Sequence, residues 1–166
     1  LLMRADPHEP LAEVEWQRVM FFVGLFMMVG GMVELGVLEA VAEFTLELTQ
    51  GNVAATAILM IWVSGIASAI VDNIPFTATM LPVVQNLDAA GLNPDNVLWW
   101  SLALGADLGG NATIIGASAN VILAGIAERE GYKINFWQFM RYGVPVAIGC
   151  MVFSTLWVLL RYIVFA

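Results

Sequence analysis

Long uncharged stretches, separated by short polar ones, dominate the pattern along this chain. Residues 1–15 are polar, contain two prolines and are interpreted as a linker, whereas residues 19–33 carry no charge. A helix of about 20 apolar residues crosses the ~30 Å hydrocarbon core of a bilayer. The pattern therefore predicts a first membrane span over residues 16–38, with Trp16 and Arg18 at its interface.

The next segment, residues 38–50, has a different period. Glu39, Glu43 and Glu47 recur every four residues between apolar positions, so they share one face of a helix. This predicts a short amphipathic helix lying in the membrane surface. A solvated extension of the first span is the alternative.

Residues 53–87 form two apolar arms around a polar break. The first arm is uncharged from Val53 to Val71, Asp72-Asn73-Ile74-Pro75 is the break, and the second arm runs from Phe76 to Leu87. A helix of that second length extends about 18 Å, too short to cross a bilayer. We therefore predict a re-entrant helical hairpin with its tip inside the membrane.

Residues 97–127 contain one charge, Asp107, in thirty-one residues. A continuous helix would be about 46 Å long, and residues 105–113 (GADLGGNAT) are poor at holding a helix. The pattern predicts a discontinuous transmembrane helix, broken near the midplane where the backbone lines a cavity or is buried in protein. A last span, residues 139–165, is expected to bend at Pro145.

Composition strengthens the assignment to an all-α integral membrane protein. The chain is 60% hydrophobic and 12% charged, with a mean hydropathy of +0.83; soluble domains average about 45–50% and 25%. The lone Cys150 and His8 lie far from any metal-binding or catalytic spacing. We expect no enzyme activity, no cofactor and no nucleic-acid partner, with the lipid bilayer as the surroundings.

Basic residues predict the orientation in the membrane. If residues 53–87 enter and leave the membrane by one face, Arg4 and Arg18 fall on the same side of the membrane as the loop at residues 128–141. That loop contains Arg129, Lys133 and Arg141. Because basic residues favour the cytoplasmic side, we expect a multi-pass protein of the cell membrane with this loop in the cytoplasm.

Two segments collect the polar groups expected at membrane depth. In the first, Pro75 lacks a backbone donor and suits the first turn of a new helix, so two helix ends face each other around Asp72. Opposed helix ends hold ions in transporters, and an intramembrane carboxylate indicates function. The candidate ion- or substrate-binding residues are Asp72, Asn73, Pro75, Thr77 and Thr79 in the first segment, and Asp107, Gly109, Gly110, Asn111, Thr113, Ser118 and Asn120 in the second.

Structural roles remain as alternatives for these residues. Glycines in membrane helices often serve close packing, as at Gly65 or Gly109. Threonine and serine hydroxyls often bond to their own helix, and an aspartate can be a helix cap. For a bound Na⁺, the possible metal ligands are Asp72, Asn73, Asp107 and Asn111; H⁺ is the other candidate coupling ion.

The two segments resemble a known family. SAIVDNIPFTATMLPVV (68–84) and ALGADLGGNATIIGASANVILAGIAEREGY (103–132) are similar to the carboxy-terminal half of permeases of the ion transporter superfamily. That group includes arsenite permeases, NhaD-type antiporters, dicarboxylate and citrate transporters and the P-protein branch, to which the likeness is greatest. The resemblance implies inverted repeats, each with a re-entrant hairpin and a broken helix, in a homodimer that moves its substrate by an elevator-like motion.

The resemblance also limits what this chain would hold. Only one repeat is recognised, so the missing amino-terminal repeat is the expected partner and this chain would carry half of the site. Asp72 to Thr77 occupies the place of the Ser-Asn-Thr tip of the dicarboxylate branch. An anionic Asp72 would repel an anion unless it is protonated or paired with Na⁺. The substrate, a small inorganic or organic anion or cation, therefore stays open.

Two functions are compatible with the sequence. The first is a secondary active permease, an antiporter or symporter driven by Na⁺ or H⁺. The second is a non-transporting membrane scaffold or assembly half that needs a partner chain.

Overall fold

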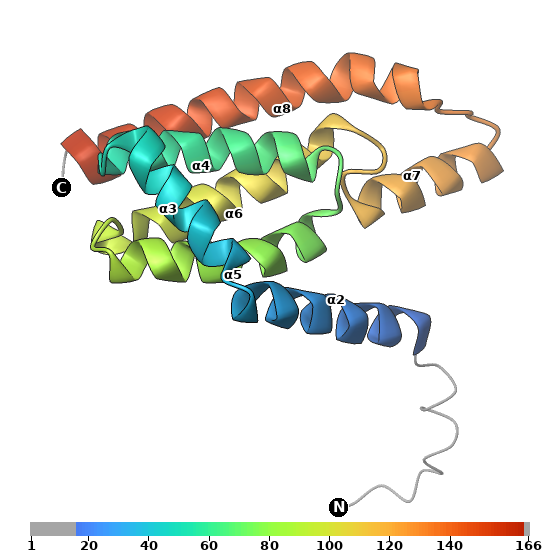
Figure 1. The fold of residues 1–166 in the computed structure, drawn as a ribbon. Coiled ribbons are helices and arrows are strands. Elements are labelled where there is room, and N and C mark those ends of the chain that lie inside the picture. Colours follow the sequence, from blue (N-terminus) through green and yellow to red (C-terminus); the bar gives the residue numbers. More distant parts are fainter. Residues whose placement is uncertain (1–15, 165–166) are drawn as a thin grey trace, which may run out of the picture.

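The computed structural model describes residues 16–164, and the expected linker, residues 1–15, lies outside them. Within the described range the chain is helical, without strands. The helices are α2 (Trp16–Glu34), α3 (Val37–Thr49), α4 (Val53–Ser68), α5 (Asn73–Ala89), α6 (Val97–Gly109), α7 (Ser118–Arg129) and α8 (Phe136–Leu159), with short 3₁₀ turns η1 (Pro94–Asn96) and η2 (Gly110–Ala112) and a π-helical end, η3 (Leu160–Val164). Figure 1 shows α4, α5 and α6 as a central group, with α8 running along α4 and α6.

The chain bends sharply between α2 and α3. The first helix ends at Glu34, and Gly36 adopts a positive φ of 70°, a conformation that glycine reaches without steric cost. The two helix axes differ by 65°. The three glutamates of α3 are exposed, whereas Leu38 and Ala42 on another face are buried, and the helix packs on α5.

Helices α4 and α5 form an antiparallel hairpin (Figure 1). Asn52 caps α4 by accepting a hydrogen bond from the Ala55 N–H, and Asp72 caps α5 by accepting one from the Ile74 N–H. Because Asp72 caps the helix, Asn73 belongs to its first turn. Helix α5 therefore has 17 residues and is about 26 Å long. The prediction of a twelve-residue second arm is therefore wrong, although α5, with 17 residues, is still shorter than the helix of about 20 residues that crosses a bilayer.

The helix break in the second segment lies further along the chain than expected. Residues 105–109 are helical in α6, and the interruption runs from Gly110 to Ala117, with Thr113 and Ala117 extended. The expected break at residues 105–113 was misplaced because Gly105 and Gly109 serve helix packing. A Cβ on Gly105 would lie 2.4 Å from the Ile61 carbonyl oxygen, and one on Gly109 would lie 2.2 Å from that of Gly65.

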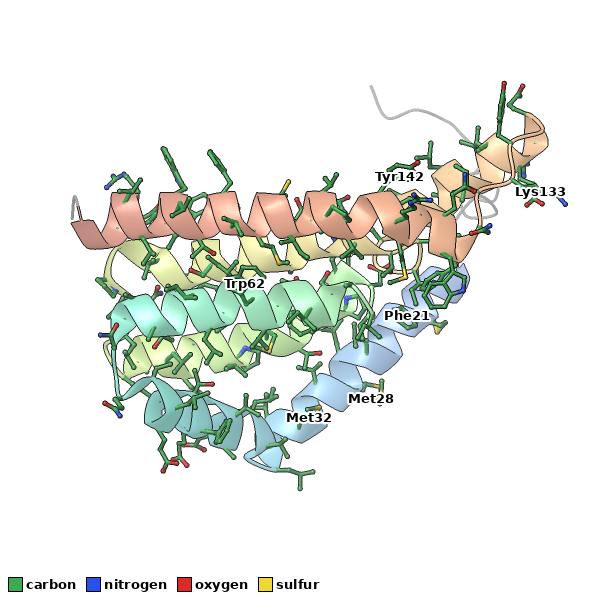
Figure 2. The ribbon with its side chains drawn as sticks, turned by 90° about the horizontal axis from the view of Figure 1, so that it is seen from above. Phe21, Met28, Met32, Trp62, Lys133 and Tyr142 are labelled. Carbon is green, nitrogen blue, oxygen red and sulfur yellow. The ribbon has the colours of Figure 1, made fainter. Side chains whose placement is uncertain are left out.

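Within residues 16–164, one helix is long and apolar enough to span a bilayer, Phe136–Tyr162, and the bent pair of α2 and α3 would supply a second. Helix α4 is apolar but shorter. Large apolar side chains are exposed on the outer helices, among them Met28 on α2 and Tyr142 on α8 (Figure 2). The buried core lies between α4, α5 and α6, around Ile61, Val83 and Leu98.

Candidate functional site

The turn of the α4–α5 hairpin meets the interruption between α6 and α7, and we call this meeting place the junction (residues 68–72 and 110–118). Asp72 joins its two sides. Its Oδ1 accepts the Ile74 N–H at 3.2 Å, and its Oδ2 accepts the Ser118 hydroxyl at 2.5 Å. The cap interpretation of Asp72 is thus correct for one oxygen, while the other oxygen contacts the first residue of α7.

Thr113 makes a second connection across the junction. Its hydroxyl donates to the Ala69 carbonyl at 2.5 Å and accepts the Gly116 N–H at 2.9 Å. The residue is 6% exposed, so both hydrogen bonds are protected from water. Ser118 and Thr113 therefore do not bond back to their own helix, which was the alternative considered for Ser118.

Ser68 makes the third connection, and it is not among the residues to which the sequence analysis assigns a role. Its buried hydroxyl donates to the Ala106 carbonyl at 2.5 Å, near the end of α6. A serine repeated after four residues, Ser64 and Ser68, on an otherwise apolar helix was the available signal. Such a stripe of small polar residues indicates a helix-packing face.

Asn120 supports the interrupted backbone from α7. Its side-chain amide donates to the Gly110 carbonyl at 3.0 Å and to the Thr113 carbonyl at 2.9 Å. Carbonyl groups left unpaired by a helix break must be satisfied inside a membrane protein. Asn120 therefore positions the interruption between α6 and α7, residues 110–117, which we call the link, and its amide nitrogen is already used in these two hydrogen bonds.

The remaining candidates of the second segment have mixed surroundings. Gly109 packs on the Gly65 backbone, and Gly110 lies against Gly116, whose own Cβ would be 2.6 Å from the Gly110 carbonyl oxygen. Asn111 is exposed, and Gly143 of α8 approaches its backbone carbonyl. The packing interpretation of the glycines thus holds at Gly109.

The candidates of the first segment divide between two places. The Thr79 hydroxyl bonds back to the Pro75 carbonyl in the first turn of α5, so this threonine follows the structural alternative. Asn73 and Thr77, by contrast, line a cavity of about 410 Å³ together with Asp107 of α6.

The two acids expected in one site line different cavities. Asp72 borders a cavity of about 230 Å³ with Ser118, whereas Asp107 is exposed in the cavity with Asn73 and Thr77. Within residues 16–164, no group of three or more His, Cys, Asp or Glu residues could hold a metal ion. Of the four expected Na⁺ ligands, Asp72 lines one of these cavities, and Asn73 and Asp107 line the other.

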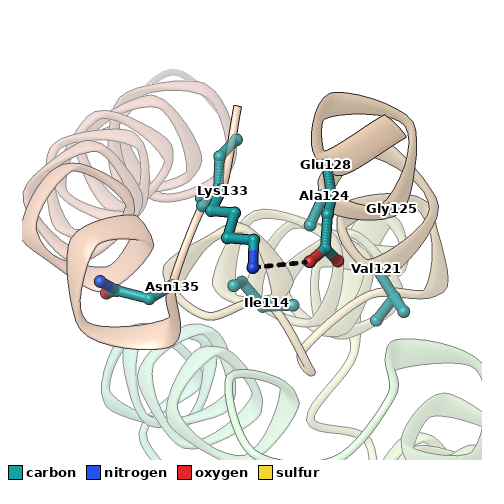
Figure 3. A pocket seen from close by; sticks show the side chains of 8 residues that line it. Ile114, Val121, Ala124, Gly125, Glu128, Lys133 and Asn135 are labelled. Atoms are coloured by element: carbon teal, nitrogen blue, oxygen red, sulfur yellow. Dashed lines mark ion pairs between the residues drawn. The ribbon is translucent and has the colours of Figure 1, made fainter. Parts of the chain in front are cut away.

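A larger cavity, about 470 Å³, lies beside the junction between α7 and the start of α8 (Figure 3). Ile114 of the link forms one wall, and a Lys133–Glu128 ion pair at 3.8 Å crosses the cavity. Both charged side chains are largely exposed, at 85% and 62%. Such a pair contributes little to stability.

Comparison with known protein families identifies one whose sequence pattern matches this chain. The family described as citrate transporter (CitMHS) matches residues 1–105, which include the hairpin and end within α6. The family is described as a transporter family and the Mycobacterium bovis relative is named a transporter, and neither name is that of an enzyme, in agreement with the sequence analysis.

The relatives match nearly the whole chain. An uncharacterized transporter of Mycobacterium bovis is 48% identical over 158 residues, covering 94% of this chain and 37% of the relative. A 46 kDa membrane protein of Mycobacterium leprae is 42% identical, covering 99% and 39%, and the P protein of Sus scrofa is 47% identical, covering 92% and 19%. This chain thus spans less than half the length of these relatives, and the matched part lies in their carboxy-terminal half. No solved structure shows a significant match.

Proposed function

Because the chain belongs to the citrate transporter family, within the ion transporter superfamily, we propose that it is part of a secondary active permease. The coupling ion, Na⁺ or H⁺, binds at the junction. It neutralises Asp72 and permits a small organic or inorganic anion to bind or to be exchanged.

The observation that carries this proposal is the Asp72–Ser118 hydrogen bond, which connects the capped start of α5 to the start of α7. It brings a carboxylate to a place where two helices end and two begin. Helix ends of this kind hold anions at their N-termini and Na⁺ or H⁺ near free carbonyls.

The kind and number of oxygen atoms at the junction favour a monovalent cation. The junction has one carboxylate, the Ser118 hydroxyl and backbone carbonyls from both sides, including that of Ser68, which faces Gly116. Divalent ions such as Ca²⁺ are usually held by several carboxylates. The cavity that Asp107 lines with Asn73 and Thr77 is left out of this ion site because Asp72 does not line it.

The substrate class follows from charge and from the family. An ionised Asp72 repels an anion at short range, by an energy that is greater in a low-dielectric site than in water. Binding of Na⁺ or H⁺ to Asp72 removes this repulsion. The cation therefore binds first, and the anion of the citrate transporter family binds second.

The chain supplies half of the site, and a preceding repeat supplies the rest. The short share of each relative that this chain covers supports this view, as does α7, which has no buried side chain and so leaves its faces open to another segment. The α4–α5 hairpin is re-entrant in this proposal, and two protomers form a dimer. The loop at residues 128–141 lies in the cytoplasm; Arg4 and the side chain of Arg18, which contribute to that argument, lie outside the described part.

The test is cation-dependent stability in detergent. Na⁺ at ten times its Kd stabilises a one-site protein by about 1.4 kcal/mol. We expect Na⁺, but not K⁺, to raise the thermal midpoint of the native protein and of Asp88→Asn, an exposed control at the end of α5. Asp72→Asn keeps a good helix cap and abolishes the increase. For H⁺, the same variants are compared over a pH series.

Two outcomes decide against the proposal. One is an Asp72→Asn protein that responds to Na⁺ and pH as the native protein does. The other is equal stability of the native protein in Na⁺ and K⁺ at every pH. A partner chain that co-purifies, together with the absence of flux in liposomes even when that partner is added, would indicate the scaffold alternative.

A further inference from the structure

The cavity of about 410 Å³ lies between α2, α5 and α6, apart from the Asp72–Ser118 contact. Its polar lining comes from Asp107, Asn73 and Thr77. The rest of the wall is apolar, with the large side chains of Phe26, Ile74 and Leu81. We call it the Asp107 cavity.

The Asp107 cavity has a negative charge that no basic lining residue balances. Asp107 is the one charged residue that lines the Asp107 cavity, and no lysine or arginine lines it. Among the described side chains, the one ion pair is Lys133–Glu128, and no hydrogen bond to the Asp107 carboxylate is found. The Asp107 side chain is exposed, so its carboxylate is accessible to an occupant, and a charge-assisted hydrogen bond favours an occupant that brings a positive charge.

A bare metal ion does not suit this place. Hard cations require about six or more oxygen ligands, and three polar side chains line the cavity. No acidic or histidine cluster able to hold a metal occurs in the described part of the chain. The volume, in contrast, is in the range of small-molecule pockets, about 300–1,000 Å³.

We infer that the Asp107 cavity binds an organic cation, an ammonium group joined to an apolar body. The ammonium group pairs with the Asp107 carboxylate, and the side chains of Asn73 and Thr77 supply additional hydrogen bonds. The apolar body contacts Ile74 and Leu81. The same chemistry is found in a free amine and in the ammonium headgroup of a lipid.

The position gives such a ligand a mechanical effect. Helix α2 packs on α3 and α5, and the cavity adds a wall from α2, through Phe26, to walls from α5 and α6. An occupant touches all three helices at once. It therefore stabilises the contact of α2 with the hairpin and with α6.

The probe is phenethylammonium, compared with its neutral analogue 2-phenylethanol in detergent. We expect the amine to raise the thermal midpoint of the native protein and of the exposed control Asp88→Asn. In Asp107→Asn, the amine concentration needed for half of the effect increases about tenfold or more, the loss expected for a charge-assisted hydrogen bond. The neutral alcohol has a weaker effect on the native protein.

The inference is overturned if Asp107→Asn responds to the amine as the native protein does, or if the alcohol is equally effective. The source is distinguished in phosphatidylglycerol nanodiscs with or without phosphatidylethanolamine. If the ethanolamine lipid weakens amine binding to the native protein but not to Asp107→Asn, a lipid headgroup is the occupant; if binding is unchanged, it is a free amine. Na⁺-dependent stability, tested with Asp72→Asn, is a separate readout.

Discussion

The substitution Gly109→Ala tests the close packing that brings the junction together. Gly109 of α6 lies on the backbone of Gly65 in α4, and an added Cβ would be 2.2 Å from the Gly65 carbonyl oxygen and 2.3 Å from its Cα. Ordinary contacts begin at 3.4 Å, so the shortfall is about 1.2 Å (3.4 − 2.2). Backbone atoms cannot rotate aside, and the helices must therefore move apart.

The cost has two parts. Overpacking of this kind costs about 1–3 kcal/mol. A separation of about 1.2 Å also lengthens the Ser68–Ala106 and Thr113–Ala69 hydrogen bonds from 2.5 Å to about 3.7 Å, beyond hydrogen-bonding distance. Each lost bond costs about 0.5–1.5 kcal/mol. The total is a loss of about 2–6 kcal/mol in the free energy of unfolding.

Thermal unfolding in detergent, followed by circular dichroism, measures this loss. At about 2–4 °C per kcal/mol, the midpoint falls by about 4 °C or more. Gly125→Ala in α7 is the matched control, because its Cβ would meet nothing within 4 Å and alanine is the better helix former. If Gly109→Ala were no less stable than Gly125→Ala, the packing argument would be refuted.

Three further predictions concern single groups. Thr113→Val removes the hydrogen bond to the Ala69 carbonyl and leaves buried polar groups unpaired, so we expect the free energy of unfolding to fall by about 2–4 kcal/mol. Thr113→Ser largely avoids this loss, and equal unfolding midpoints for Thr113→Val and Thr113→Ser would contradict the prediction. Asn120→Asp places a carboxylate against the Gly110 carbonyl and should speed amide hydrogen exchange in residues 110–117 more than Asn120→Ala does. The reverse order would show that the Asn120 amide does not hold this segment in place. With Cys150 replaced by alanine, the single cysteine introduced by Lys133→Cys should react with an impermeant maleimide from the cytoplasmic side alone, and labelling from the outside would contradict the proposed topology.

Much of the architecture could be predicted because it depends on local signals. Asp72 followed by Pro75 marks a helix end and a helix start, and the structure has α5 beginning at Asn73. Gly36 was not recognised as the bend, although a glycine after an apolar run is a known signal for a helix end. The length of α5 was underestimated because polar Asn73 and Asp88 were excluded from a helix that includes them.

The composition of the site could not be derived from the sequence in full. The sequence does not distinguish a glycine that makes the backbone flexible from one that permits close packing. At Gly109 the role depends on contact with Gly65, forty-four positions earlier. The division of Asp72 and Asp107 between two cavities likewise depends on where the hairpin docks on α6. Both are properties of tertiary contacts, which spacing along one chain does not encode.

Amide hydrogen exchange tests most directly whether the two sides of the junction form one cation site. Exchange is compared in saturating Na⁺ and in equal K⁺ for the peptides covering residues 68–74 and 110–118. The proposal predicts that Na⁺ slows exchange in both peptides together, and that Asp72→Asn abolishes both effects. Slowing in one peptide alone, or the same slowing in K⁺, would contradict a Na⁺ site shared by the hairpin turn and the link.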